Sequence, residues 1–256
     1  MIIPRVALFE FEDQWWCPAL VRDATAAYLE TVHRTFGPYD GVAQLMAPLV
    51  AAQPQRRIVD LGAGAGGLWP RLLDRMAVLG VNASVTCTDL RPKLRAASPA
   101  AADRRIAFLT QPVAADSVPL QLDGVRTMFT ALHHLEPAAA QRVFLAARAA
   151  RTPIAVFEAT HRSPKGVAAT ALIPLMALGL MLVVRPAKPL TLLFTYLIPV
   201  VPLAIAWDGF VSTLRTYTAA ELRNMTAALT TPDYEFVAGE IAGTGLPITY
   251  CIGRPR

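Results

Sequence analysis

Apolar and polar residues follow different patterns in four successive regions of the chain. Residues 1–55 have apolar positions at helical spacing, and residues 56–160 alternate short apolar runs with longer amphipathic segments. Residues 164–207 are strongly apolar, and residues 208–256 return to a mixed composition. These patterns predict an α/β core that is joined to N-terminal helices and to an apolar insertion.

The second region has the pattern of a parallel sheet, because short apolar runs alternate with helical segments there. The helices are predicted at 68–79 and 137–151. The strands are predicted at 57–61, 83–88, 106–109, 125–130 and 153–159.

The first and last regions add elements on either side of this sheet. A helix over 19–32 follows Pro18, which suits a first helical turn, and Asp40 is the predicted N-cap of a second helix. That second helix is expected over 40–51. In the last region a helix over 218–229 precedes two strands whose turn-rich connection predicts an antiparallel hairpin at the sheet edge. These two strands are expected at 234–237 and 248–252.

The composition excludes several classes of protein. Apolar residues make up 54% of the 256 positions and charged residues 17%, which is the opposite of a disordered chain. The three cysteines, Cys17, Cys87 and Cys251, are too few for a disulfide scaffold and do not have zinc-site spacing. With four histidines in the chain, we expect no metal site.

The net charge of +5 does not indicate a nucleic-acid partner. The 24 basic residues are scattered, and no basic run with interleaved aromatic residues follows the pattern of a phosphate-binding surface. The N-terminal residues lack a basic start and an apolar core, so they do not resemble a secretory signal. A cytoplasmic location is the default expectation.

The apolar region consists of two uncharged stretches, 167–184 and 190–207, each near the lower limit of about 18 residues for a membrane span. Full spanning is disfavoured by Pro199 and Pro202, because a broken helix leaves backbone groups unpaired in lipid. We expect first a lipophilic acceptor pocket, second peripheral membrane contact and third a homodimer interface. Arg185 and Lys188 would suit anionic head groups.

A glycine loop follows the first strand of the second region. The run Asp60-Leu61-Gly62-Ala63-Gly64-Ala65-Gly66 places glycines where a strand opens into a helix, so that a ligand can lie against bare backbone. The spacing G-x-G-x-G differs from the dinucleotide fingerprint, and Asp89 closes the second strand where a carboxylate can accept ribose hydroxyls. An adenine-containing ligand fits this pattern.

With these motifs the chain resembles the class I S-adenosylmethionine-dependent methyltransferases. The resemblance rests on the glycine loop, Asp89, the stretch Asp123 to Leu135 and the final hairpin. It implies a Rossmann-like sheet and S-adenosylmethionine as the cofactor, with Asp89 on the ribose and Leu90 beside the adenine. The amino-acid end of the cofactor would then be bound by Asp60, Gly62, Ala63, Gly64 and Gly66, with Thr130 also near the cofactor.

One position departs from the family pattern. The family often carries an aspartate on the adenine amino group after the third strand, and the aligned residue here is Ala114. Either Asp116 replaces that aspartate or the contact comes from the backbone.

Three residues at the carboxyl ends of predicted strands are candidate catalytic groups. His133 and His134 follow the fourth strand and Glu158 ends the fifth, at the sheet edge where ligands bind. Methyl transfer needs a base only when the acceptor carries a proton, and His134 or Glu158 would supply it. The alternatives are a packed or capping histidine and a simple Glu158–Arg162 salt bridge.

The segment before the glycine loop is expected to close over the acceptor. Residues 9–16 mix aromatic and acidic side chains, and the acids Glu10, Glu12 and Asp13 could lie inside or outside the site. Asp208 is expected in a turn or helix cap. The candidate substrate-contacting residues are Phe11, Trp15, Trp16, His161 and Tyr196.

These inferences predict methyl transfer to a small lipophilic or aromatic acceptor. The alternatives are a methyltransferase fold that performs non-methylating cyclisation and a non-catalytic membrane or assembly protein. Residues 1–55 would form a helical lid, 56–163 with 208–256 the cofactor-binding core, and 164–207 the cap.

Overall fold

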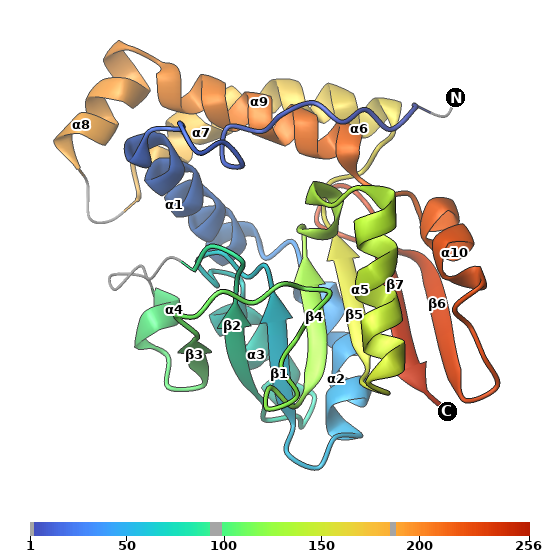
Figure 1. Cartoon of the computed structure of the whole chain (residues 1–256). Helices are drawn as coiled ribbons and strands as arrows, with labels where there is room; N and C mark the ends of the chain where they lie inside the picture. The colour runs from blue at the N-terminus through green and yellow to red at the C-terminus, as the bar shows by residue number, and fades with distance from the viewer. Residues whose placement is uncertain (1–2, 93–98, 185–187) are drawn as a thin grey trace.

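A seven-stranded sheet forms the centre of the structure, a computed structural model that describes residues 3–92, 99–184 and 188–256 (Figure 1). The strand order is β3-β2-β1-β4-β5-β7-β6, and β7 is antiparallel to both of its neighbours. The predicted parallel sheet with an antiparallel hairpin at its edge is confirmed. The strands are β1 (Arg57–Leu61), β2 (Ser84–Thr88), β3 (Ile106–Phe108), β4 (Val125–Phe129), β5 (Ile154–Glu158), β6 (Tyr234–Ile241) and β7 (Ile248–Pro255).

Helices cover both faces of the sheet. One face packs against α2 (Ala43–Ala51) and α3 (Trp69–Val78), and α4 (Pro99–Ala102) lies beside β3. The other face packs against α5 (Pro137–Ala149) and α10 (Ala219–Ala227). The 3-10 turn η1 (Asp40–Val42) precedes α2, and η2 (Leu132–His134) follows β4.

Asp40 does not act as the predicted N-cap. Its side chain makes no capping hydrogen bond and instead accepts from the guanidinium groups of Arg71 and Arg75 on α3, at distances of 2.6–3.1 Å. The Asp40 carboxylate binds these arginines in preference to backbone amides, because a bidentate guanidinium–carboxylate pair is stronger than a neutral hydrogen bond.

A helical cap lies over the carboxyl ends of the parallel strands (Figure 1). It is formed by the N-terminal helix and the apolar insertion, and Ala24, Tyr28, Ala177, Val201 and Ile205 belong to its own hydrophobic core. Its helices are α1 (Ala19–Phe36), α6 (Pro164–Ala169), η3 (Thr170–Leu172), α7 (Ile173–Met181), α8 (Pro189–Leu192), η4 (Leu193–Leu197) and α9 (Val200–Arg215).

Both apolar stretches form helices, and the second of them is bent. In the described residues, the continuous helix Pro164–Met181 is long and apolar enough to cross a membrane, and 17% of it is buried inside the structure. The second stretch breaks between Leu197 and Val200 with a bend of 75°. Pro199 stands at this break, as expected for a residue that cannot donate a helical hydrogen bond. Arg185 lies outside the described residues.

Residues 3–18 are not helical and run along α9 (Figure 1). The Val6 amide donates to the Leu214 carbonyl over 3.2 Å. The amides of Phe11 and Glu12 donate to the Asp208 carboxylate over 2.6 and 3.2 Å. The prediction of a turn or cap at Asp208 is therefore wrong, because this residue lies inside α9, is 5% exposed and anchors a distant segment.

Asp208→Ala is expected to release the N-terminal segment from α9. Loss of two buried hydrogen bonds to one carboxylate should lower the free energy of unfolding by about 1–3 kcal/mol and speed proteolysis near residue 10. Asp23→Ala is the control, because Asp23 is an exposed helical aspartate that pairs with Lys188. Urea denaturation and limited proteolysis measure both effects, and equal behaviour of the two variants would contradict the anchoring role.

Candidate functional site

The glycine loop between β1 and α3 has the backbone that its sequence predicts. Gly62, Gly64 and Gly66 have φ values of +70°, +53° and +65°, which side chains disfavour. The amide of Ala63 donates to the Thr88 carbonyl over 2.9 Å, which ties the loop to the end of β2. A Cβ added at Gly64 would meet no atom within 4 Å, so this glycine borders open space.

Asp89 lies directly below that space. Its carboxylate accepts from the Gly64 amide over 3.1 Å and from the Arg91 amide over 2.8 Å. The Asp89 carbonyl accepts from Val113, which brings the connection after β3 to the same place. Leu90 is exposed beside Asp89. A ribose-sized ligand above Gly64 would therefore meet a carboxylate and an apolar side chain.

Asp60 does not face this space, contrary to the expectation that it binds a ligand. Its carboxylate is 1% exposed and accepts from Trp69 Nε1 over 2.7 Å and from Thr127 Oγ1 over 2.8 Å. Burial raises the pKa of Asp60 to about 7 despite these two hydrogen bonds. Asp60 thus joins β1, α3 and β4 beneath the loop, and its effect on a ligand is indirect.

Asp116 is also directed elsewhere. Its carboxylate accepts from Arg142 Nε on α5 over 2.9 Å, so an adenine contact would require this ion pair to open. Ala114 stands in the connection that Val113 ties to Asp89. Of the two alternatives for an adenine contact, this arrangement favours the backbone around Ala114 over the side chain of Asp116.

Thr130 occupies a strained position after β4. Its φ is +46°, which is rare for a threonine, and its hydroxyl contacts the Tyr39 hydroxyl and accepts from the Ala159 amide over 3.3 Å. A Cβ on Gly62 would approach the next residue, Ala131, to 3.3 Å. The strained turn therefore places η2 directly against the glycine loop.

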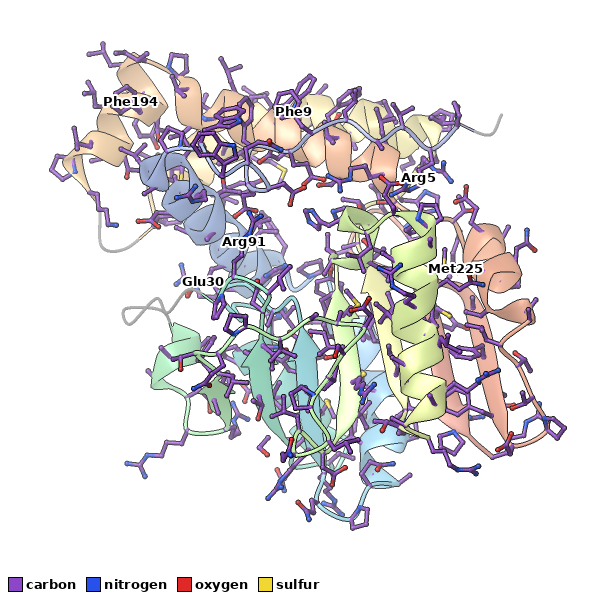
Figure 2. All side chains as sticks on the ribbon, in the orientation of Figure 1. Arg5, Phe9, Glu30, Arg91, Phe194 and Met225 are labelled. Carbon is purple, nitrogen blue, oxygen red and sulfur yellow. The ribbon has the colours of Figure 1, made fainter. Side chains whose placement is uncertain are left out.

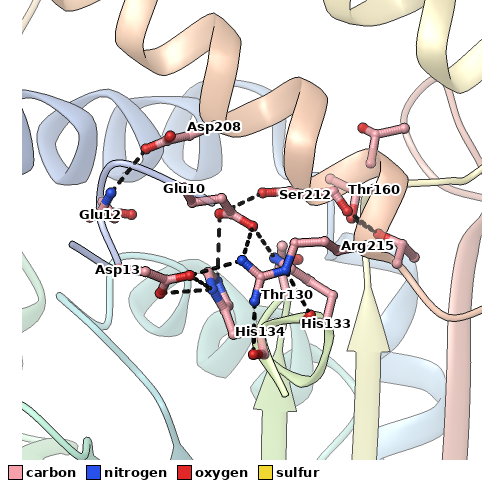
Figure 3. A network of polar contacts seen from close by, with 12 residues as sticks. Glu10, Glu12, Asp13, Thr130, His133, His134, Thr160, Asp208, Ser212 and Arg215 are labelled. Atoms are coloured by element: carbon pink, nitrogen blue, oxygen red, sulfur yellow. Dashed lines mark hydrogen bonds and ion pairs between the residues drawn. The ribbon is translucent and has the colours of Figure 1, made fainter. Parts of the chain in front are cut away.

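A charged cluster lies between η2 and the cap (Figure 3). We use this name for Glu10 and Asp13 of the N-terminal segment, His133 and His134 of η2, Glu158 of β5 and Arg215 of α9. All except Asp13 and His134 are buried.

Each histidine of the cluster binds a carboxylate through Nδ1. His133 Nδ1 is 2.7 Å from Glu158 Oε2, and the other Glu158 oxygen accepts from the His133 amide over 3.1 Å. His134 Nδ1 is 3.1 Å from Asp13 Oδ1. The alternative interpretation of Glu158, a salt bridge with Arg162, is wrong, because Glu158 is fully buried on His133 and Arg162 pairs with Glu221.

Arg215 of α9 connects the N-terminal segment with η2. Its guanidinium donates to Glu10 over 3.1 Å and to Asp13 over 2.9 Å. It also donates to the carbonyls of His133 and His134 over 3.2 and 2.8 Å. The N-terminal segment also contacts the connection after β2, where Arg91 donates to the Asp13 carbonyl over 3.1 Å.

These contacts shift two pKa values in opposite directions. Burial alone would lower the pKa of His134, but its hydrogen bond with Asp13 and the charges of Glu10 and Asp13 raise it to about 9. Burial alone would raise the pKa of Asp13, but His134 and Arg215 hold it well below its usual range. His134 is therefore protonated near neutral pH and is a poor general base.

The expected substrate-contacting residues do not gather in one place. Phe11 and Trp16 pack edge to face at 5.9 Å above α9, while Trp15 is 86% exposed. His161 contacts Ser163 and Glu240. Tyr196 belongs to η4 and donates to the Leu178 carbonyl over 2.7 Å.

The position of η4 separates Tyr196 from the cluster. Phe194 of the same turn lies at the end of the cap opposite to Arg5 (Figure 2). Arg5 donates to the His133 carbonyl over 3.2 Å, so the charged cluster lies at the same end of the cap as Arg5.

Comparison with known proteins gives structural but not sequence relatives. No family model and no curated protein matches the sequence. Among solved structures, the plantazolicin methyltransferase BpumL in complex with S-adenosylhomocysteine aligns over 96% of this chain and 94% of its own, with a TM-score of 0.56 and 11% identity. This chain has the class I methyltransferase fold.

A second neighbour shares this class I methyltransferase fold. NcsB1, an O-methyltransferase from neocarzinostatin biosynthesis, is in complex with S-adenosylmethionine and 2-hydroxy-5-methyl naphthoic acid. It aligns over 93% of this chain with a TM-score of 0.50 and 16% identity, and the match covers 59% of NcsB1. At these identities the comparisons establish the fold.

Sequence reasoning missed several residues of the site. Arg215 stands in a segment whose pattern indicates only an amphipathic helix, and nothing there signals a buried arginine. Trp69 and Thr127 look like ordinary core positions, although they hold Asp60. For Glu10 the sequence did contain a signal, namely the high density of acidic and aromatic residues over 9–16.

Ionisation of Asp60 is expected to destabilise the folded state. Burial raises its pKa from 3.8 to about 7, so the folded protein keeps a proton that the unfolded chain releases in this interval. The free energy of unfolding of the wild type should therefore fall, relative to that of Asp60→Asn, as the pH rises from about 4 to about 7. Urea denaturation across this range measures the difference, and a pH-independent difference would contradict the assignment.

Proposed function

We propose that this protein transfers the methyl group of S-adenosylmethionine to a small-molecule acceptor. The observation that carries the proposal is the open space bounded by Gly64 and Asp89 in a class I methyltransferase fold. The two neighbours are methyltransferases in complex with S-adenosylmethionine or S-adenosylhomocysteine, which supports the same cofactor here.

The loop residues fit this cofactor. Positive φ at Gly62, Gly64 and Gly66 keeps side chains away from the ligand, and the first turn of α3 follows directly with its amides. Asp89 is half-buried and can exchange its contact with the Gly64 amide for the ribose hydroxyls. Asp60 supports the loop from below through Trp69.

The charged cluster is the proposed acceptor side of the site. Methyl transfer is an in-line displacement in which the acceptor atom forms the new bond to carbon while the bond to sulfur breaks, so orientation dominates its rate. Glu158 is engaged by His133, and His134 is protonated near neutral pH. Nε2 of His133 is buried and has no hydrogen-bond partner in the described part of the chain.

We infer that the acceptor carries a protic nucleophile on a lipophilic body. The polar face of the cluster would receive the nucleophile, and the apolar cap above it would receive the remainder. NcsB1 carries an acceptor of this general kind, a hydroxylated naphthoic acid.

Gly64→Ala is expected to weaken S-adenosylmethionine binding by at least about 10-fold, because the new methyl group enters the ligand space. Asp89→Ala should weaken it by about 10- to 100-fold through loss of the ribose hydrogen bonds. Gly80→Ala is the matched control, since Gly80 also has positive φ and no atom within 4 Å of an added Cβ but lies after α3. Calorimetric titration measures all three variants.

Unchanged affinity in Gly64→Ala and Asp89→Ala would contradict the cofactor site. Formation of S-adenosylhomocysteine with an acceptor would separate methyl transfer from a non-methylating use of the same site. Gly80→Ala is expected to lose stability to a similar extent as Gly64→Ala while retaining wild-type affinity.

We further propose that the cap contacts a lipid surface, from which a lipophilic acceptor would enter. Residues 164–207 contain three basic residues and no acidic residue, which suits anionic head groups. A contiguous apolar surface is uncommon on a soluble monomer. Large exposed apolar side chains of the cap are Leu172, Leu175, Leu182, Val183, Leu190, Leu197, Ile198, Val200 and Leu203.

The double variant Leu197→Glu, Leu203→Glu is expected to reduce binding to anionic phospholipid vesicles by at least about 10-fold, because two charges enter the apolar surface. Leu120→Glu is the control, since Leu120 is 85% exposed in the connection before β4, compared with 75% and 60% for the cap leucines. Vesicle co-sedimentation measures binding. Concentration-dependent dimerisation without vesicle binding would contradict the proposal and indicate a second copy as the partner.

A further inference from the structure

We propose that Glu10, His133 and His134 form a binding site for a divalent transition-metal ion. One ligand atom from each of the three residues lies within 4.8 Å of the others. Nε2 of His133 is 3.8 Å from Glu10 Oε1, and Nε2 of His134 is 3.9 Å from Glu10 Oε2. Both imidazole rings thus direct Nε2 toward the carboxylate of Glu10 (Figure 3).

The unsatisfied nitrogen of His133 is the second observation that indicates a ligand. His133 is fully buried, and its Nε2 makes no hydrogen bond with any described residue. A buried polar atom without a hydrogen bond destabilises the folded state, so its presence needs a compensating partner. A metal ion bound to Nε2 would supply that partner.

The residues around the ligands have the arrangement of a metal site. Metal-binding histidines usually donate their other ring N–H to a carboxylate, which fixes the tautomer and the ring orientation. Here Glu158 holds His133 Nδ1 at 2.7 Å and Asp13 holds His134 Nδ1 at 3.1 Å. Both rings are therefore oriented with Nε2 toward Glu10, and a metal ion would take the place of the proton on Nε2 of His134.

The charge of the cluster favours a dication. Glu10, Asp13 and Glu158 bring three carboxylates together, and Arg215 is the cationic side chain that pairs with Glu10 and Asp13. When a metal ion displaces the proton of His134, three carboxylates face one guanidinium, which is an excess of two negative charges in a largely buried place, where uncompensated charge is costly. A divalent cation balances this excess.

The distances require a small inward movement of the ligands. Two ligands at about 2.1 Å from one tetrahedral ion lie about 3.4 Å apart, so each atom would move by less than about 1 Å. Glu10 has lone pairs available for this, although Arg215 and Ser212 already donate to its two oxygens over 3.1 and 2.9 Å. Two imidazoles and a carboxylate suit Zn²⁺ and Fe²⁺ and leave coordination positions open.

This inference rests on the proposed function and specifies its acceptor. The ion would bind at the turn after β4, whose Ala131 adjoins the glycine loop at Gly62. Its open positions would hold an acceptor oxygen next to the cofactor methyl group. The acceptor class is therefore a hydroxyl- or carboxyl-bearing molecule.

The test measures Zn²⁺ binding to the chelator-treated full chain, by metal analysis after gel filtration and by calorimetric titration. The wild type is expected to hold about one equivalent, and His134→Ala to bind at least about 10-fold more weakly. Asp13→Asn retains all three ligands and should weaken binding by about 10- to 100-fold through loss of the partner that orients His134. His161→Ala is the control, because His161 lies 3.4 Å from Glu240 outside the cluster.

Two results would overturn the metal site: wild-type protein that holds less than about a tenth of an equivalent, or His134→Ala that binds as the wild type does. Circular dichroism of each variant checks the fold. Titration of S-adenosylmethionine into the same samples separates the two proposals. Cofactor binding without Zn²⁺ binding would refute only the metal site, and Zn²⁺ binding without cofactor binding would refute only the proposed methyl transfer.

Discussion

The guanidinium of Arg215 is the contact on which the arrangement of the site depends. Arg215 ends the last cap helix, is 7% exposed, and binds Glu10, Asp13 and the backbone of His133 and His134. A buried arginine needs acceptors for its donors, and these acceptors come from the N-terminal segment and from the turn after β4. One side chain therefore joins cap, lid segment and sheet, and it places both histidines over the glycine loop.

The sheet and the glycine loop could be predicted because their signals are local. Short apolar runs alternate with helical segments, and the three glycines after the first strand allow the positive φ that they adopt here. The predicted strands all appear, within a few residues of the expected bounds. The position of His133, His134 and Glu158 also follows from local information, because carboxyl ends of neighbouring parallel strands share one sheet edge.

The individual side-chain partners could not be predicted, because they depend on contacts between distant segments. Asp40 looks like a helix cap, but two arginines of α3 bind it. Asp208 looks like a turn residue, but it lies inside α9 and holds the N-terminal segment. Asp60 belongs to a ligand-binding motif, but its carboxylate faces the core. In each case groups from a distant segment bind the carboxyl group, and the local pattern does not indicate them.

The central claim is that the cofactor and the charged cluster face each other across one site. A crystal structure of the protein soaked with S-adenosylhomocysteine tests it most directly. We predict ribose hydroxyls on Asp89, the amino-acid end over Gly64, and the sulfur directed toward His133 Nε2. A ligand whose sulfur points away from the cluster, or no ligand at the glycine loop at saturating concentration, would contradict this arrangement.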